Sequence, residues 1–257
     1  FFDAGASVLV CSRNGEEAAA AAHSVDPTGK RFVGIQADVS VVADCEKIIN
    51  SAVERFGTVD ILVNNAGIYG EIGSLETCDI DKWASAINVN LLGTVACTKF
   101  VLPIMKKAGK GKIINFAGAG VGGKKPLPNF SPYYTSKTAV VGFTETIASE
   151  IAASNIQINA VAPGAINTGM TEALLAGGPD KAGADSYQKA LEQKEKGGES
   201  LDKVISLIHF LCSADADNVT GRLVSAKWDS HEMLKGLPVD GDLLKLRRID
   251  NDLFYGK

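Results

Sequence analysis

Two pieces of sequence decide the fold, Lys112-Ile113-Ile114-Asn115-Phe116 and Ser131-Pro132-Tyr133-Tyr134-Thr135-Ser136-Lys137. The first piece contains β-branched residues and precedes a glycine-rich segment, which predicts a buried strand. In the second piece Ser131 suits a helix N-cap, and Pro132 suits the first helical position, where a missing N–H costs nothing. A strand therefore leads through a loop into a helix that begins near Ser131.

Tyr133 and Lys137 stand four residues apart in this helix, so they lie on one face and within reach of each other. Free tyrosine titrates near pH ~10. An ammonium about 6 Å away, at an effective dielectric of about 20, favours the phenolate by roughly 3 kcal/mol, or about two pKa units. The pair is therefore a candidate proton donor, although two common residues at helical spacing are a weak signal when taken alone.

Composition narrows the class of protein. The chain has 257 residues, enough for one large α/β domain, and 46% of them are hydrophobic, which is typical of a globular protein. A net charge of −4 and a pI near 5.5 provide no basic surface for nucleic acid or for an anionic membrane. No run reaches the ~18 uninterrupted apolar residues of a membrane span, and the opening Phe1-Phe2-Asp3 lacks the basic start of a signal peptide. We therefore expect a cytoplasmic protein without nucleic-acid or membrane partners.

The cysteines and histidines indicate neither disulfides nor a metal site. The 5 cysteines are odd in number and scattered, without a Cys-x-x-Cys pair, so free thiols in a reducing compartment are the better interpretation. The 3 histidines lack zinc-like spacing to the cysteines. We predict no metal.

Strands and helices alternate along the chain. Apolar runs bounded by turn residues predict strands at 7–11, 32–38, 60–64, 112–116, 157–162 and 222–227. The stretches between them predict helices near 16–23, 41–56, 81–107, 131–154 and 201–212, and residues 1–6 have the pattern of a helix tail with a glycine stop. This order predicts an α/β fold with a doubly wound, Rossmann-like parallel sheet, whose ligands bind beyond the carboxyl ends of the strands.

A glycine-rich loop follows the 112–116 strand. Its sequence, Gly118-Ala119-Gly120-Val121-Gly122-Gly123, matches the Gly-x-Gly-x-x-Gly pattern of dinucleotide-binding loops. Such a loop must open directly into a helix whose N-terminus meets the pyrophosphate, but Lys124-Lys125-Pro126-Leu127-Pro128 follows here. We interpret it as a flexible active-site loop.

Two later segments differ in composition from the rest. Residues 169–200 contain a glycine-proline break and a polar helical stretch at 184–196, which fits either a mobile flap over a substrate site or a solvated excursion. Residues 228–257 form a tail, which we interpret as a docking arm or an oligomer contact. Without internal repeats or a low-complexity linker, residues 1–257 are assigned to a single domain.

With these pieces in order, the sequence resembles the short-chain dehydrogenase/reductase family, in the short reductase branch similar to 3-oxoacyl-carrier-protein reductases. Each matching motif is weak alone, and their joint order supports a functional reading of the Tyr133–Lys137 pair. The matches are Arg13, Asp38-Val39, Asn64-Asn65-Ala66-Gly67, Asn90-Leu91-Leu92-Gly93, Tyr133-x-x-x-Lys137, Asn159-Ala160-Val161-Ala162-Pro163-Gly164, Ile166-Asn167-Thr168 and Val219-Thr220-Gly221.

The resemblance implies hydride transfer between a nicotinamide cofactor and a carbonyl or alcohol. It assigns Tyr133 as the proton donor, and Lys137 as the residue that binds the nicotinamide ribose and lowers the phenol pKa. Asn90 would position a water, or alternatively pin a helix irregularity.

The remaining cofactor contacts also come from the resemblance, with helix capping, ordinary turns or a surface arginine as their alternatives. A guanidinium just past a strand end can bind a 2′-phosphate, whereas NAD preference normally needs a carboxylate there. We therefore expect NADP(H) to be preferred over NAD(H). The contacts are Arg13 at the 2′-phosphate, Asp38 and Val39 at the adenine, Asn65, Ala66 and Gly67 at the ribose, and Pro163, Gly164, Ile166 and Thr168 at the carboxamide.

The chain departs from the family pattern in three places. The family's usual substrate-binding serine is replaced by Gly118, and its C-terminal Asp-Gly-Gly by Ala226-Lys227-Trp228-Asp229. The family's first strand and its phosphate-binding glycine loop are expected to be missing before Phe1. This predicts an N-terminally truncated chain, with a gap at the centre of the sheet.

We therefore expect an NADP-dependent oxidoreductase that acts on a small carbonyl or secondary alcohol. The alternatives are a catalytically degenerate nucleotide-binding protein, suggested by Gly118, and a nucleotide-sugar epimerase, because that branch also uses Tyr-x-x-x-Lys. By the same resemblance, we expect a homodimer or homotetramer formed through the long helices near 81–107 and 131–154.

Overall fold

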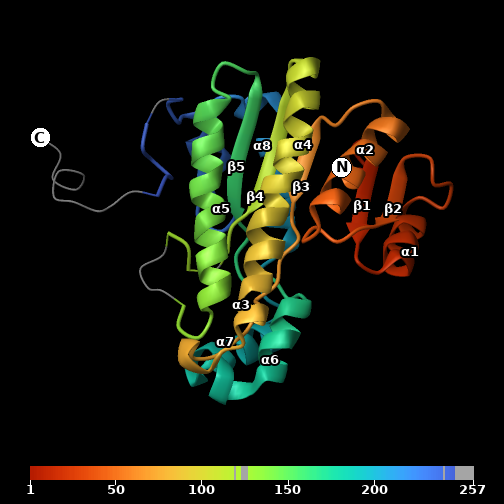
Figure 1. Cartoon of the computed structure of the whole chain (residues 1–257). Helices are drawn as coiled ribbons and strands as arrows, with labels where there is room; N and C mark the ends of the chain where they lie inside the picture. The colour runs from red at the N-terminus through yellow and green to blue at the C-terminus, as the bar shows by residue number, and fades with distance from the viewer. Residues whose placement is uncertain (119, 123–126, 240, 247–257) are drawn as a thin grey trace, which may run out of the picture.

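The computed structural model describes residues 1–118, 120–122, 127–239 and 241–246, so parts of the expected glycine-rich loop and tail lie outside the described residues. Strands and helices alternate along it as expected (Figure 1). The strands are β1 (Val8–Ser12), β2 (Phe32–Gln36), β3 (Ile61–Asn64), β4 (Gly111–Phe116), β5 (Ile156–Ala162) and β6 (Leu223–Ser225). The helices are α1 (Gly15–Val25), α2 (Val42–Phe56), α3 (Ile80–Ala86), α4 (Gly93–Ala108), α5 (Ser131–Glu150), α6 (Gly169–Ala182), α7 (Ala184–Lys196), α8 (Leu201–Leu211) and α9 (His231–Lys235), with short turns η1 (Leu75–Thr77) and η3 (Ala214–Ala216) and a π-helix, η2 (Ile87–Leu92).

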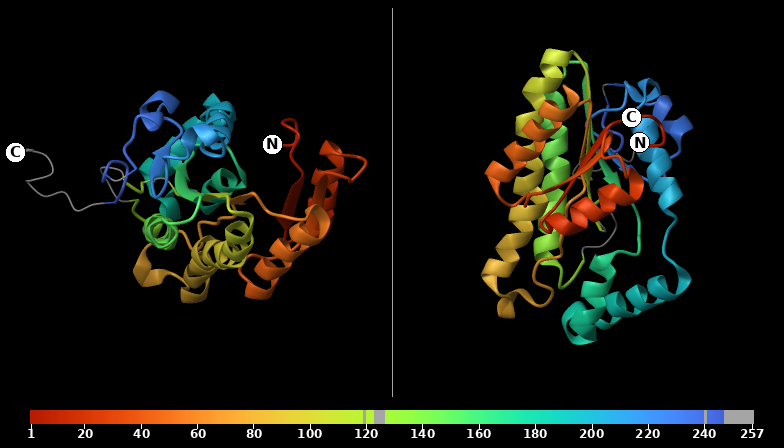
Figure 2. Two further views of the ribbon diagram at one scale, coloured as in Figure 1. Left: turned by 90° about the horizontal axis from the view of Figure 1, so that it is seen from above. Right: turned by 90° about the vertical axis from the view of Figure 1, so that its right-hand side faces the viewer.

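All the strand pairs are parallel, as in a Rossmann-like fold, but they form two sheets. Strands β3, β4, β5 and β6 lie side by side in that order, with Ile113 opposite Ile158 where β4 meets β5. Strands β1 and β2 pair with each other, from Val8 opposite Phe32 to Ser12 opposite Gln36. Figures 1 and 2 show this two-stranded unit, with α1, at one side of the molecule.

The expectation of a missing first strand and phosphate loop is wrong. The structure has a first strand, β1, which forms a five-residue parallel ladder with β2. The expected helix tail at residues 1–6 is also wrong, because these residues form turns with Gly5 at φ 93°. The guanidinium of Arg31 donates hydrogen bonds to the carbonyl oxygens of Phe2 and Ala6, and so fixes the turn from a distant part of the chain.

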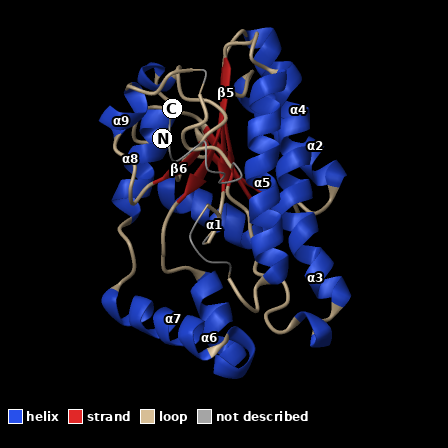
Figure 3. Cartoon of the chain, turned by 90° about the vertical axis from the view of Figure 1, so that its left-hand side faces the viewer, coloured by secondary structure: helices blue, strands red, loops and turns tan. Residues whose placement is uncertain are grey.

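The four-stranded sheet is covered by helices on both faces (Figure 3). Ile113 packs into a cluster with α2 and α4, whereas the next residue, Ile114, packs into a cluster with α8. Successive side chains of a strand point to opposite faces, so a strand that is apolar on both faces is buried between two helix layers. The apolar run that predicted this strand is therefore explained by the doubly wound architecture.

One long helical stretch runs through α3, η2 and α4 from Ile80 to Ala108. By length and composition it could cross a membrane, which is weak evidence because buried helices of soluble proteins pass the same test. Its residues Val101 and Met105 are 0% exposed in the core against the sheet. We therefore interpret it as a core helix, interrupted by the π-helical turn.

Residues 169–200 and the described part of the C-terminal tail both have defined structure. Residues 169–200 contain α6 and α7, which lie below the carboxyl ends of the strands (Figures 1 and 3). Arg222, which is 0% exposed, donates hydrogen bonds to the carbonyl oxygens of four tail residues and so fixes the described part of the tail to its own chain. These residues are Pro238, Val239, Gly241 and Leu243.

Candidate active site

The first turn of α5 carries Tyr133 into the protein, where it is 8% exposed. The helix begins one residue earlier than the sequence indicated, since Phe130 occupies the N-cap position and Pro132 falls in the first turn. The expectation that Ser131 caps the helix is wrong. Its hydroxyl instead accepts a hydrogen bond from Trp83 Nε1 at 3.0 Å, which links the start of α5 to α3.

Lys137 lies one turn further along α5 and is 4% exposed. Its Nζ donates a hydrogen bond to the carbonyl oxygen of Phe116 at the end of β4, at 2.8 Å. Burial penalises the charged ammonium and lowers the pKa of Lys137 from its ordinary 10.5 to about 8. The lysine therefore changes charge close to working pH.

Tyr133 and Lys137 both pack closely against the backbone at Gly118. A Cβ atom added to Gly118 would lie 2.6 Å from the Tyr133 hydroxyl oxygen and 2.9 Å from Cγ of Lys137. Real Cβ atoms essentially never approach other atoms this closely, so the phenol occupies the space that a side chain at 118 would need. The phenol therefore depends on a glycine at this position.

Asn90 lies in the π-helical turn η2 and is 0% exposed. Its amide holds the loop after β3, because Oδ1 accepts a hydrogen bond from Ile68 N at 2.8 Å and Nδ2 donates to Ile68 O at 2.9 Å. Nδ2 also lies 2.9 Å from Ser136 Oγ, in α5. These bonds hold the π-helical turn to the loop after β3 and to α5, which fits the alternative that Asn90 pins a helix irregularity.

Gly67 completes this constellation from the carboxyl end of β3. A Cβ atom at Gly67 would lie 3.3 Å from Lys137 Nζ and 3.4 Å from Asn90 Oδ1, so its bare backbone passes between these two groups. The structure thus brings together residues from four separate parts of the sequence, two of which follow the carboxyl ends of parallel strands.

A buried polar network behind the site was not predicted from the sequence. Asn64 Nδ2 donates to Asn115 Oδ1 at 2.8 Å, and Asn115 Nδ2 donates to Thr144 Oγ1 at 2.9 Å. Buried amides are costly unless they are hydrogen-bonded, and these bonds tie β3 to β4 and β4 to α5. The available signal was an asparagine inside each of two apolar strands.

Comparison with known proteins agrees with this geometry. A model of the short chain dehydrogenase family matches residues 1–177. The chain belongs to this family. Dehydrogenase/reductase SDR family member 4 of Sus scrofa is 34% identical over 220 residues, which are 86% of this chain and 76% of the relative. Levodione reductase is similar in structure, with a TM-score of 0.74, 30% identity and 86% of each chain covered. An actinorhodin polyketide ketoreductase with NADPH has a TM-score of 0.76 at 30% identity, with 87% of each chain covered.

The chain is thus an NAD(P)-dependent short-chain dehydrogenase/reductase, an oxidoreductase that acts on carbonyl compounds or alcohols with a nicotinamide cofactor. The family match begins at residue 1. The matched range therefore includes β1, the first strand of the described fold.

The dehydrogenase carries two of its expected adenine-side residues on the β1–β2 unit. Asp38 Oδ1 accepts hydrogen bonds from Ser40 N at 2.9 Å and Ser40 Oγ at 2.7 Å. The Ser40 backbone N–H is the largest cause that lowers the pKa of Asp38, and the positive charge of Arg13 also lowers it. Arg13 and Asp38 therefore lie close enough to interact, beyond the ends of neighbouring strands.

The neighbouring Val39 is tied to the catalytic half of the dehydrogenase. A Cβ atom at Gly93 would lie 2.9 Å from the Val39 carbonyl oxygen, so α4 begins in close contact with the loop after β2. The same carbonyl accepts a hydrogen bond from Cys45 Sγ at 3.2 Å. Val39 is therefore held from both sides, whereas Arg13 is exposed.

The loop after β5 holds the four residues expected at the carboxamide. Pro163 and Gly164 follow the strand directly, with Gly164 at φ 85°, a left-handed conformation that favours glycine. Ile166 N donates to Gly164 O at 3.2 Å, and Thr168 caps α6 through a hydrogen bond from Met170 N at 3.3 Å. These four residues form one turn that leads from β5 into α6.

The described residues fit the ribose and nicotinamide end of the cofactor. The bare backbone at Gly67 lies beside Lys137 Nζ, which can donate hydrogen bonds to ribose hydroxyls. The N-terminus of α1 fits a pyrophosphate poorly, because Asn14 Oδ1 already accepts from Glu16 N and Glu17 N, and both glutamates are negative. The best fit is therefore in the catalytic half.

Tyr69 is a site residue that the sequence did not reveal. Its ring meets the Tyr133 ring edge to face, with the centroids 5.0 Å apart at 68°, and meets Phe130 at 5.1 Å and 63°. Tyr69 lies in the irregular segment after β3, where no periodic pattern indicates which way a side chain points.

Proposed function

We propose that this dehydrogenase interconverts a small ketone and its secondary alcohol, and that it prefers NADP(H). The observation that carries the proposal is the convergence of Tyr133 and Lys137 on Gly118, at the carboxyl end of β4. A phenol held against a backbone beside a buried lysine suits the transfer of one proton to or from a substrate oxygen.

Each side chain then has a distinct role. Tyr133 donates its hydroxyl proton to the oxygen of the carbonyl as that oxygen becomes an alkoxide, and accepts the proton in the reverse direction. Lys137, as an ammonium below its pKa of about 8, stabilises the phenolate that remains. Asn90 fixes the loop after β3 through Ile68 and holds a water for proton exchange with solvent.

The nicotinamide cofactor, when bound, supplies or accepts the hydride. We assign its ribose to Lys137 and the turn of Asn65, Ala66 and Gly67. We assign its other parts to three further groups of residues. These are Pro163, Gly164, Ile166 and Thr168 for the carboxamide, Asp38 and Val39 for the adenine, and Arg13 for the 2′-phosphate.

Arg13 supports the preference for NADP(H). It is exposed beyond β1 and lies near Asp38, so its guanidinium can pair bidentately with a phosphate at the edge of the adenine site. The similar polyketide ketoreductase, 30% identical, is described with NADPH.

We also propose a cytoplasmic homodimer or homotetramer in which α4 and α5 pair between subunits. Phe100, Leu102 and Ile104 of α4 pack against the core and are only partly buried, so part of their apolar surface is left for a partner helix to cover. Light scattering after size-exclusion chromatography measures the state directly, and a monomer at micromolar concentration would contradict this assignment.

The test is oxidation of NADPH and NADH against a panel of small ketones and aldehydes. Turnover of at least one carbonyl compound, with a lower KM for NADPH than for NADH, supports the proposal. Gly118, in place of a hydroxyl-bearing residue, keeps one alternative open, namely a protein that binds nucleotide without turnover. Micromolar NADPH binding with no oxidation across the panel would favour that alternative, and conversion of a nucleotide sugar to its epimer would indicate an epimerase.

A further inference from the structure

An apolar cluster connects α6 and α7, which we call the lid, with Tyr133. Tyr133 packs in it with Phe130, which is 1% exposed, and with Leu174 of α6, which is 7% exposed. The lid therefore contacts the reacting centre through apolar side chains. The other members are Ala182 and Ala190, with the partly buried Tyr69, Ile72, Leu127, Met170, Leu175 and Tyr187 around them.

The aromatic side of the cluster is uncharged at working pH. Tyr69 presents its ring to both Tyr133 and Phe130, and burial raises the pKa of the Tyr69 phenol above its ordinary value of 10. A phenol with a raised pKa stays protonated where the enzyme works. Tyr69 therefore supplies aromatic surface beside the reacting hydroxyl, without competing as a second acid.

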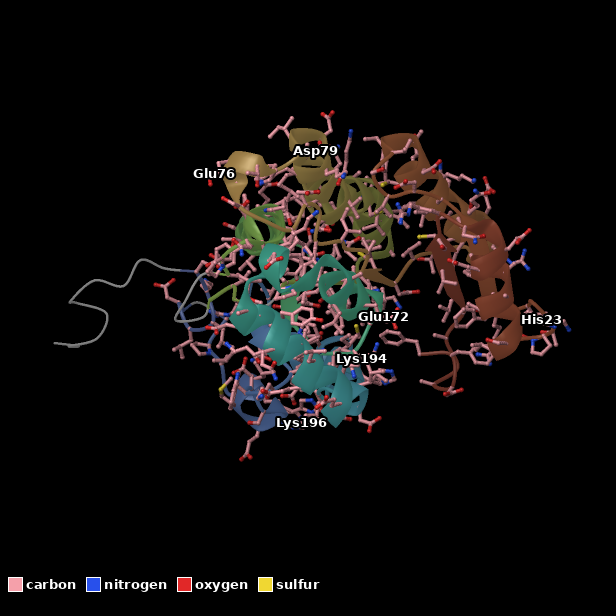
Figure 4. The ribbon with its side chains drawn as sticks, turned by 90° about the horizontal axis from the view of Figure 1, so that it is seen from below. His23, Glu76, Asp79, Glu172, Lys194 and Lys196 are labelled. Carbon is pink, nitrogen blue, oxygen red and sulfur yellow. The ribbon has the colours of Figure 1, made fainter. Side chains whose placement is uncertain are left out.

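Two charged side chains that neighbour the cluster in sequence are paired. Glu71, beside Ile72, lies 3.9 Å from Lys82 Nζ and 4.0 Å from Lys181 Nζ, and Lys181 is beside Ala182. Figure 4 shows charged side chains on the lid surface seen from below, including Glu172, Lys194 and Lys196. The side chains that pack around Tyr133 in this cluster are aliphatic or aromatic.

From this arrangement we infer the substrate class: the dehydrogenase takes a neutral ketone or secondary alcohol in which one substituent of the reacting carbon is an apolar chain that ends in a branched alkyl or aryl group. This inference rests on the proposed function. The apolar group would replace lid contacts at Leu174 and lie against the Tyr69 ring, while the oxygen meets Tyr133. A carboxylate or phosphate among these apolar side chains would lose its hydration, which is strongly unfavourable.

The experiment compares two substrates of matched shape, 5-methylhexan-2-one and 4-oxopentanoate, in which an isopropyl group and a carboxylate are exchanged. We expect kcat/KM to be at least ~30-fold higher for the neutral ketone, because the site desolvates the variable group. Equal or better turnover of 4-oxopentanoate would overturn the inference. Failure of both substrates, together with every carbonyl of the panel, would instead refute the proposed function.

Binding measured without turnover separates these two failures further. Saturation-transfer NMR on the protein alone should detect the neutral ketone and show a weaker signal for 4-oxopentanoate at equal concentration. A stronger signal for the carboxylate contradicts the inference, whether or not hydride transfer occurs.

A variant of the lid sharpens the assignment. Leu174→Arg places a cation in the cluster and should shift the kcat/KM ratio toward 4-oxopentanoate by about tenfold or more. Glu172→Gln is the control, because this exposed residue lies on the same helix and should leave the ratio unchanged.

Leu174→Ala covers the case in which the arginine variant fails to fold. It should lower kcat/KM for 5-methylhexan-2-one by about tenfold, because apolar contact is lost, and lower the value for butan-2-one by a clearly smaller factor. Two outcomes would show that the lid does not determine substrate preference. These are equal losses for both ketones, or a Leu174→Arg variant with an unchanged kcat/KM ratio for 5-methylhexan-2-one and 4-oxopentanoate.

Discussion

The four-stranded half of the molecule and the β1–β2 unit hold their functional residues in different ways. In the four-stranded half, Lys137 and Asn90 are almost fully buried and hydrogen-bonded to backbone carbonyls of other elements. In the β1–β2 unit, Arg13 and Asp38 are near the surface, and the only fully buried residues of α1 are alanines. The first half can fix a reacting group in place, whereas the second can adjust to a ligand.

A cleft separates the two regions. It has a volume of about 700 Å³ and lies between β1 and β3, with a lining that includes Ile48 of α2 and Cys97 of α4. The two regions are in contact where α2 packs against α4, and where Val39 of the loop after β2 meets Gly93. We therefore expect changes in the four-stranded half to affect turnover, and changes in the β1–β2 unit to affect cofactor affinity.

The largest effect is expected for Tyr133→Phe, which removes the reacting hydroxyl and keeps the ring. General acid catalysis contributes typically ~10²–10⁴-fold, so kcat should fall by this factor while the melting temperature stays within a few degrees. Tyr134→Phe, about 100° round the helix, is the control and should be mild. Residual activity above a tenth of the parent would refute the role of Tyr133.

Gly118→Ala is expected to lower turnover by about ten- to a hundredfold, because a 1 Å displacement of a reacting group can cost that much. The added Cβ would collide with the Tyr133 hydroxyl, as measured above. For the same reason we expect Gly118→Ser to be harmful rather than to restore a missing hydroxyl. The control is Gly142→Ala on the same helix as Tyr133, where nothing lies within 4 Å of the added atom. A Gly118→Ser variant with higher kcat would overturn this view.

Arg13→Ala tests the β1–β2 unit. A charge-assisted hydrogen bond is worth ~1.5–3 kcal/mol, so the variant should bind NADPH roughly ten- to a hundredfold more weakly and NADH almost as before. The expected kcat at saturating cofactor is unchanged, in contrast to the two changes above. Lys30→Ala, an exposed cation at the opposite end of the strands, serves as the control. Equal losses of affinity for both cofactors would show that Arg13 does not bind the 2′-phosphate.

The smallest expected effect is a change with pH in the parent enzyme. Because the pKa of Lys137 is lowered to about 8, its ammonium is lost above that pH, and kcat/KM should decline there rather than near 10.5. The stability effect has the opposite direction. Between pH about 8 and 10.5 the unfolded chain binds more protons than the folded one, so the free energy of unfolding gains from Lys137 as pH rises through this window.

Lys137→Met supplies the matching control for both measurements. It should lose the stability change between pH 8 and 10.5, since the group that titrates is gone, and it should lack most of the activity. A parent profile of kcat/KM that stays flat up to pH 10 would contradict the assigned pKa and the role of the ammonium.

Local sequence patterns were sufficient to predict most of the secondary structure and the central pair of the site. Four-residue spacing in a helix places Tyr133 and Lys137 on one face whatever surrounds them. Apolar runs between turn residues marked all the strands, with ends displaced by one or two residues. The capping of α5 was wrong because Ser131 gained a partner, Trp83, from a helix 48 residues away in sequence.

The sequence by itself therefore determined the alternation of strands and helices, the family and the residues at the carboxyl ends of the strands. Tertiary structure decided how these residues act: that Gly118 makes room for the Tyr133 hydroxyl, that Asn64 and Asn115 share a buried hydrogen bond, and that Tyr69 lies against the catalytic ring. It also decided that β1 pairs only with β2 among the described strands. The physical reason is range, because helix spacing and strand alternation are set by neighbouring residues, whereas contacts between distant segments depend on how whole elements pack.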